Sequence, residues 1–323
     1  MLTMPRTTGL AAIIALCLPG LALAQQCDIK DIDTFGPAGS TQERIHLVNR
    51  DGGASEADDL IVFRAKLRVN TDGAPTSYSP TDLTGTVNAI NNICNGVSVK
   101  RMSNGRTLAC ADARTVFANF RDANWREPAG FTIRWQNVLA ARTVDGRQVP
   151  CIFQEGPNKG YFGSLTTLRN GLGGSAAGEC LVNDQIDHRH IPALVLPGGD
   201  NALRRFGARI GDLAIAHNPA TGVTQAAILA DSGPADNLGE GSVALNMALL
   251  QRNEQPKTYP EALRLDTGNR QILVAIIPRS AGFERQRPYS AQNISARVTS
   301  WLASHGYGEQ AGLAQAIDPC APR

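Results

Sequence analysis

The chain has 323 residues, of which 42% are hydrophobic and 19% are charged, with 31 basic and 29 acidic side chains. This is the composition of a globular protein, and it excludes a coiled coil, a disordered chain and a polytopic membrane protein. The net charge of +2 lacks the basic excess of a nucleic-acid binder, so we expect no nucleic-acid partner.

The N-terminus has the pattern of a secretory signal peptide. Arg6 precedes an apolar run over residues 9–23, and residues 22–24 (ALA) supply a small-residue cleavage pattern. A membrane anchor is the alternative, but it needs roughly 20 uninterrupted apolar residues, and Pro19 breaks this shorter run. We therefore predict a signal peptide over residues 1–24, a secreted or periplasmic protein, and no stable membrane insertion.

The cysteines predict disulfides. Up to three bonds are possible, and Asn-Gly turns between Cys94 and Cys110 favour a local pair there. A zinc site is the alternative, but no Cys-x-x-Cys motif occurs, so we expect no metal. The six cysteines that follow the signal peptide are Cys27, Cys94, Cys110, Cys151, Cys180 and Cys320.

The first part of the mature chain gives few structural signals. Residues 25–58 are rich in Gly, Asp and Ser with little periodicity, which indicates a loosely packed lead-in. Apolar and basic side chains alternate over residues 60–69, which predicts a half-buried strand ended by the turn at residues 72–75. Residues 83–140 contain only short apolar stretches and have no clear assignment.

After Pro150 the pattern is that of a β protein. Short apolar runs between Gly, Pro and Asn residues predict strands, and residues 218–222 are typical of the loop of a hairpin. Ser242 and Ser290 predict the starts of two packing helices. We expect a mainly β fold with flanking helices (α+β) as one domain over residues 59–305, with a tail over 306–323. The predicted strands are residues 191–196, 212–217, 223–230 and 271–277, and the helices run to Leu250 and to about Gly306.

Two carboxylates near the end of this pattern suggest chemistry. An apolar strand delivers Asp231 into a Gly-Pro turn, and the segment GEGS presents Glu240 at a helix start. Glycosidic cleavage uses two carboxyl groups on opposite sides of a groove, one as proton donor and one as base or nucleophile. The alternative is structural, with Asp231 capping the turn and Glu240 complementing the helix dipole.

Other motifs predict little. Residues 171–176 (GLGGSA) match a nucleotide-binding loop, but no buried strand precedes them, and we expect no cofactor. Neither Gly-x-Ser-x-Gly nor His-Glu-x-x-His occurs, which disfavours a serine hydrolase or a zinc protease.

Five segments in order resemble family 75 glycoside hydrolases, the fungal-type chitosanases. The resemblance implies that Asp231 and Glu240 are essential and that the protein cleaves β-1,4 linkages in chitosan with inversion. The order of the segments is also similar to that of double-psi β-barrel proteins, including lytic transglycosylases, which implies a six-stranded barrel and peptidoglycan as an alternative substrate. The segments are residues 72–78 (DGAPTSY), 160–168 (GYFGSLTTL), 186–197 (IDHRHIPALVLP), 211–213 (GDL) and 230–242 (ADSGP to GEGS).

Local sequence suggests a role for each site residue. Apolar residues precede Asp231, so burial would raise its pKa and suit it as general acid, while the helix N-terminus would keep Glu240 ionised as the base. Tyr161, Asp187 and Asp212 are our candidates for binding amino sugars; alternatively, the two Asp residues only hold turns and Tyr161 lies in the core. We expect a monomer that acts on an amino-sugar polysaccharide. A non-catalytic glycan-binding protein remains a further alternative.

Overall fold

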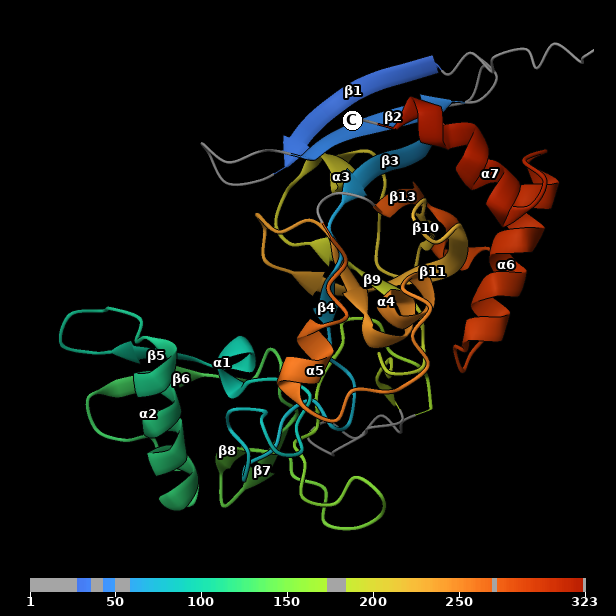
Figure 1. The fold of residues 1–323 in the computed structure, drawn as a ribbon. Coiled ribbons are helices and arrows are strands. Elements are labelled where there is room, and N and C mark those ends of the chain that lie inside the picture. The colour runs from blue at the N-terminus through green and yellow to red at the C-terminus, as the bar shows by residue number, and fades with distance from the viewer. Residues whose placement is uncertain (1–27, 36–42, 50–58, 173–183, 269–271, 322–323) are drawn as a thin grey trace, which may run out of the picture.

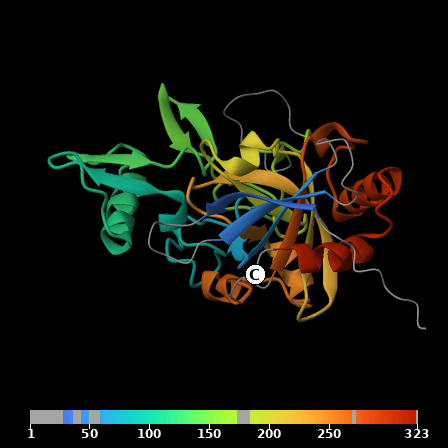
Figure 2. The same cartoon turned by 90° about the horizontal axis from the view of Figure 1, so that it is seen from above.

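The structure, a computed structural model, describes residues 28–35, 43–49, 59–172, 184–268 and 272–321. A mixed β-sheet lies at its centre, and a small lobe projects from one side (Figures 1 and 2). In spatial order, the strands of this sheet are β1 (Asp28–Phe35), β2 (Glu43–Asn49), β3 (Leu60–Ala65), β13 (Ile272–Ile277), β10 (Leu213–Asn218), β11 (Val223–Gly233), β9 (Ala193–Pro197), β12 (Glu240–Ser242) and β4 (Arg68–Asn70).

The middle of the sheet is built from the predicted apolar runs. Every residue of β9, β10 and β13 is buried, as expected for strands that are covered on both faces. β10 pairs antiparallel with β13 and with β11, and residues 218–222 form the turn of the β10–β11 hairpin. The predicted strands after residue 190 and this hairpin are therefore confirmed.

The predicted strand over residues 60–69 is divided into two strands that pair at different places. β3 pairs with β2 and β13. Only two residues separate the end of β3 from the start of β4, which pairs in parallel with β12. Among the described residues the sheet is open, with β1 and β4 at its edges. The mainly β, α+β class is confirmed, but the closed six-stranded barrel that the resemblance implies is not found there.

The two predicted packing helices begin at their predicted caps. Ser242 Oγ accepts a hydrogen bond from the N–H of Leu245 (3.1 Å), and Ser290 forms a capping box with Asn293. The described helical elements are α1 (Ile93–Gly96), α2 (Cys110–Asp122), α3 (Ala202–Arg205), α4 (Val243–Leu249), α5 (Tyr259–Leu263), η3 (Ser280–Gly282), α6 (Ala291–Ser304), α7 (Gln310–Ile317) and η4 (Asp318–Cys320).

Apolar layers cover both faces of the sheet. Leu213 and Ile215 of β10 pack in one layer, and the alternate residues Ala214 and Ala216 pack in the other, as the two-residue period of a strand requires. Helices α6 and α7 cover the first face (Figure 1), and α4 contributes to the second layer. Two of the strands that carry pocket residues, β9 and β11, contribute side chains to both layers.

Much of the segment without a clear prediction, residues 83–140, forms the small lobe. β5 (Ser98–Arg101) pairs with β6 (Phe131–Arg134), and α2 packs beside them around its own aromatic core. A second hairpin follows, with β7 (Ala141–Val144) and β8 (Arg147–Pro150). The core rings, with centroids 5.3–6.1 Å apart in contacting pairs, are Phe117, Phe120, Trp125 and Phe162.

A disulfide between Cys94 and Cys110 joins α1 to the first residue of α2, as predicted. The two cysteines are 16 residues apart in sequence, so the disulfide reduces the conformational entropy of this part of the unfolded chain. Cys27 and Cys180 lie outside the described residues, as does the predicted signal peptide over residues 1–24.

The segments near both ends of the described chain contribute to the fold more than the sequence indicated. Within the expected lead-in, β2 pairs with β3, and its Ile45 and Leu47 are buried. Within the expected tail, Leu313 and Ile317 of α7 pack on the sheet. No helix in the described part of the chain is long and apolar enough to span a membrane.

Candidate active site

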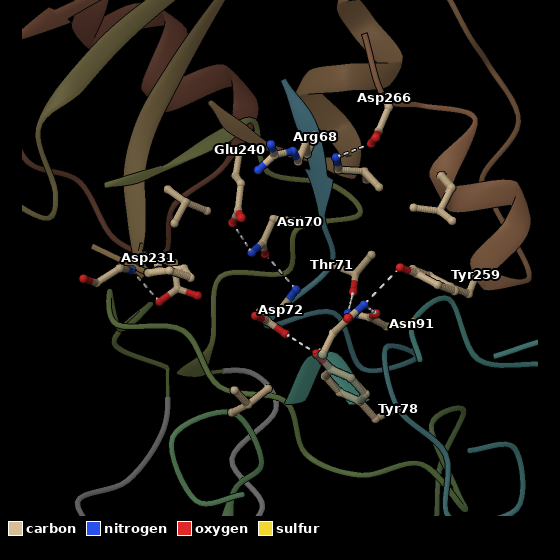
Figure 3. Close-up of a pocket in the computed structure, with 18 of the residues that line it drawn as sticks. Arg68, Asn70, Thr71, Asp72, Tyr78, Asn91, Asp231, Glu240, Tyr259 and Asp266 are labelled. Carbon is tan, nitrogen blue, oxygen red and sulfur yellow. Dashed lines mark hydrogen bonds between the residues drawn. The ribbon is translucent and has the colours of Figure 1, made fainter. Parts of the chain in front are cut away.

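A pocket of about 610 Å³ is lined by residues of β4, β9, β11, β12 and α5. Figure 3 shows that its polar side chains converge from these elements, with Asp231 and Glu240 on different strands and Asp72 between them and Tyr78. Carboxyl groups outnumber cations in the lining. The charged side chains are Asp72, Asp231, Glu240, Asp266 and Arg68.

Strand register explains why Asp231 and Glu240 face the same pocket. Asp231 of β11 is paired with Val195 of β9, and on the other side of β9 the pairing of Gly241 with Leu194 places Glu240 beside Val195 as well. Residues at one level of a sheet point to the same face, and Val195 itself lines the pocket. Glu240 is in turn paired with Arg68 of β4. The two carboxylates therefore belong to one row that crosses four strands.

Gly239 allows β12 to approach β4 this closely. Its φ of +90° is a conformation that favours glycine, and a Cβ atom there would collide with the main-chain oxygen of Lys66. The N–H of Arg68 donates to the Gly239 carbonyl (2.9 Å) across this contact. The glycine that precedes Glu240 is thus required for the position of the carboxylate.

Asp231 is half-buried, and one of its oxygens is fully engaged. Oδ1 accepts hydrogen bonds from the main-chain N–H of Thr167 (3.0 Å), its hydroxyl (2.7 Å) and the N–H of Ser232 (2.8 Å). These three hydrogen bonds fix the orientation of the carboxyl group. None of the described residues donates to Oδ2, so this oxygen can accept a proton or a hydrogen bond from a ligand.

Glu240 lies in a different environment. Burial raises its pKa above the ordinary value, and the charge of Asp231 adds to the rise. The side-chain amides of Asn70 (3.2 Å to Oε2) and Asn237 (to Oε1) donate to its two oxygens, and these hydrogen bonds and Arg68 oppose the rise. Glu240 is therefore the better proton carrier of the pair, whereas the sequence assigned that role to Asp231.

Asp72 is a third carboxyl group whose role the sequence did not indicate. Burial and the charges of Asp231 and Glu240 raise its pKa to about 8, although the hydroxyl of Tyr78 donates to its Oδ1 (2.9 Å). It therefore carries a proton at neutral pH. The sequence quoted this residue only within the segment DGAPTSY, because the groups that perturb it are more than 150 residues away.

A chain of hydrogen bonds between uncharged side chains extends from Asp72 along the pocket. Asn91 donates to the hydroxyl of Tyr78 (2.9 Å), and Asn95 donates both to Asn91 Oδ1 (2.7 Å) and to the hydroxyl of Tyr259 (3.1 Å). Such a network fixes the orientation of each amide and hydroxyl. The side of the pocket next to α1 is therefore polar but uncharged.

Asn70 is held by a buried histidine. His188 is fully buried, and its Nδ1 lies 2.9 Å from Asn70 Oδ1, which also accepts the N–H of Asp72 (2.9 Å). Because an amide oxygen only accepts, His188 carries its proton on Nδ1, and burial lowers its pKa and keeps it neutral. This arrangement turns the amide nitrogen of Asn70 toward Glu240.

The three predicted sugar-binding residues lie outside this pocket. Asp187 forms a bidentate pair with Arg189, and the hydroxyl of Tyr161 donates to the main-chain oxygen of Asn88 (3.0 Å). Asp212 is fully buried and accepts main-chain N–H groups, including that of Ala281 (2.8 Å). The structure thus brings Asp231 and Glu240 together but not Tyr161, Asp187 and Asp212.

Within the described residues, no three His, Cys, Asp or Glu side chains are grouped so that they could hold a metal ion. Comparison with known proteins gives no relative: no protein-family model matches the chain, and no curated protein matches its sequence.

Proposed function

We propose that the protein is an exported glycoside hydrolase that cleaves β-1,4 linkages in chitosan or a closely related amino-sugar polymer. One observation carries the proposal. Asp231 and Glu240 stand on the two strands that flank β9, at one level, and both face the same pocket. Most glycosidases use two carboxyl groups on opposite sides of the glycosidic bond, one as general acid and one as base or nucleophile.

The strand spacing supports inversion. Asp231 and Glu240 are separated by one intervening strand, so their Cα atoms are two strand spacings, about 9.6 Å, apart. Inverting enzymes hold their carboxyl groups roughly 6.5–9.5 Å apart, and retaining enzymes about 5–5.5 Å. The Cα separation is wider than the carboxyl–carboxyl distance of a retaining enzyme, and we infer from it a carboxyl separation that leaves room for a water molecule between the base and the sugar.

The environments suggest which group does what. Glu240, whose pKa burial raises, gives its proton to the glycosidic oxygen as the bond from that oxygen to the anomeric carbon breaks. Asp231, held in place through Oδ1, accepts a proton at Oδ2 from the water that attacks the opposite face of the anomeric carbon. The products are a free leaving-group hydroxyl and a sugar with an inverted anomeric centre.

Asp72 contributes through its proton. While it is neutral, it adds no charge to the repulsion between Asp231 and Glu240, and it can donate a hydrogen bond into the pocket. Ionisation of Asp72 would place a third negative charge beside the pair and would hold the proton of Glu240 more tightly. We therefore assign Asp72 to the neutral form in the active enzyme.

The charge of the pocket favours a cationic substrate. Four carboxyl side chains and one guanidinium line it. Asp72 and Glu240 carry protons in the active form, so Asp231 and Asp266 supply the negative charge, and Asp266 is partly compensated by Lys66, 3.4 Å away. The oxygens of the two protonated carboxyl groups can still accept hydrogen bonds from an ammonium group. A protonated amino sugar gains from such a lining, whereas the uncharged units of chitin do not. This balance is the reason for preferring chitosan.

The strand pairing is consistent with a barrel-like arrangement of six strands, if the stretch that contains β3 and β4 is counted as one strand. β3 and β4 belong to the single stretch of residues 60–70, and they pair with opposite ends of the series β13, β10, β11, β9 and β12. We interpret this stretch as the strand that would bring the two ends of the series together. Export to an oxidising compartment accords with the Cys94–Cys110 disulfide.

A substrate panel tests the function. Purified mature protein and the Asp231→Asn and Glu240→Gln variants are incubated with chitosan, chitin and peptidoglycan, and reducing ends and anhydro-sugar products are followed. We expect the wild-type protein to release reducing ends from chitosan. The rate of this release should be roughly 1000-fold lower in each variant. Anhydro products from peptidoglycan would indicate a lytic transglycosylase instead, and binding without cleavage of any polymer would indicate a glycan-binding protein.

A further inference from the structure

A second cavity adjoins the pocket on the side of the small lobe. It has a volume of about 590 Å³ and is lined by α1, by the start of β5 and by the segment that follows β6. Asn95, Asn137 and Val138 line both cavities. The acidic pocket and this cavity, which we call the lobe groove, therefore adjoin at these three residues.

The two parts also share a rigid wall. A Cβ atom at Gly96 of α1 would lie 3.0 Å from the ring of Tyr78 and 3.1 Å from Val138, so the backbone of α1 rests directly on both side chains. Tyr78 in turn donates to Asp72 in the pocket. The Cys94–Cys110 disulfide fastens α1 to α2 of the lobe.

The lobe groove differs from the pocket in its charge. The described residues that line the lobe groove include no acidic side chain, and among them Arg134 alone is charged. Gln136 and Asn137 are exposed and offer amide donors and acceptors. From the pocket to the lobe groove, the lining thus changes from carboxyl groups to amides and a guanidinium.

We propose that the lobe groove is a second subsite that holds uncharged, acetamido-bearing sugar units of the same polymer whose cationic units lie in the acidic pocket. This rests on the proposed function. An acetamido group can accept from one side-chain amide and donate to another, as the lining requires. A protonated amino group would find no carboxylate there and would lie near Arg134. The preferred substrate is therefore partly acetylated, with its acetylated units on the lobe side.

Binding measurements test this without turnover. The Glu240→Gln protein is titrated calorimetrically with hexamers of N-acetylglucosamine and of glucosamine. A Gln136→Ala variant, changed at an amide that lines the lobe groove but not the acidic pocket, should bind the acetylated hexamer roughly fivefold more weakly and the glucosamine hexamer within twofold of its parent. Arg134→Glu should strengthen binding of the glucosamine hexamer roughly fivefold at low salt, with the gain fading as salt rises.

Arg142→Glu is the matched control, because Arg142 is an exposed arginine of β7 outside both cavities, and its affinities should not change. Unchanged binding of the acetylated hexamer in the Gln136→Ala variant would overturn the proposal. So would a preference for anionic peptidoglycan fragments that Arg134→Glu abolishes. If the wild-type protein cleaves chitosan while these affinities stay constant, the subsite is refuted and the proposed function stands.

Discussion

Replacement of Asp72 by Asn should stabilise the protein at neutral pH. The pKa of Asp72 is raised from 3.8 to about 8 in the folded protein, so folding at pH 7 requires this carboxyl to take up a proton that the unfolded chain does not bind. Asn is neutral at every pH and keeps an oxygen for the hydroxyl of Tyr78. The variant therefore lacks the protonation cost.

The size and sign of the effect follow from the two pKa values. Below pH 3.8 the carboxyl is protonated in both states and costs nothing. Above it the cost grows by about 1.4 kcal/mol per pH unit and levels off above pH 8. At pH 7 it reaches about 4 kcal/mol, so the advantage of Asp72→Asn over wild type should be about 4 kcal/mol larger at pH 7 than at pH 4.

Urea unfolding with the disulfides intact, followed by circular dichroism at both pH values, measures this difference. Asp122→Asn is the control, because Asp122 is a surface carboxylate whose pKa the hydrogen bond from Arg121 lowers. It should show no stabilisation at pH 7. Equal effects of Asp72→Asn at pH 4 and pH 7 would refute the idea that Asp72 is protonated in the folded protein.

Three further outcomes follow from the same contacts. Asn70→Ala removes a hydrogen bond that lowers the pKa of Glu240, so the alkaline limb of the kcat profile should move to higher pH and kcat/KM should fall roughly tenfold in steady-state assays. Gly239→Ala forces a Cβ atom into a φ of +90° and into a neighbouring carbonyl, and should cost roughly 2–4 kcal/mol in urea unfolding. Cys94→Ser opens the Cys94–Cys110 loop and should destabilise the small lobe by about 3 kcal/mol, measured by hydrogen exchange in α2.

The convergence of Asp231 and Glu240 could be anticipated because each follows a strong local signal. An apolar run ending in Asp231 marks a buried strand, and Ser242 marks the helix that starts just after Glu240. The strands β9, β10, β11 and β13 were predictable for the same reason. What these signals leave open is register, which places the two carboxylates at one level beside Val195.

The role of Asp72 could not be anticipated, because its protonation depends on burial and on partners distant in sequence. The small lobe was missed because its aromatic residues belong to α2, to the loop after it and to Phe162, with no continuous period. Asp187 and Asp212 look like site residues in sequence. In the fold, the carboxyl group of Asp187 accepts hydrogen bonds from Arg189, and that of Asp212 accepts the main-chain N–H of Arg209.

The two ends of the chain were underestimated for a related reason. β2 has only two strongly buried apolar positions on one face, Ile45 and Leu47, within a polar segment, and this is too short a period to stand out in sequence. The helix that carries Leu313 and Ile317 is eight residues long and has no side-chain cap. Pairing with β3 and packing on the sheet, rather than local propensity, stabilise these elements.

The most direct test of the two-carboxylate account is a time-resolved proton NMR spectrum of a glucosamine oligomer during cleavage by the wild-type protein. The account predicts that the α-anomer of the new reducing end appears first and that the Glu240→Gln and Asp231→Asn proteins give no new anomeric signal. A β-anomer or an anhydro sugar formed first, or no new reducing end from the folded wild-type protein, would contradict it.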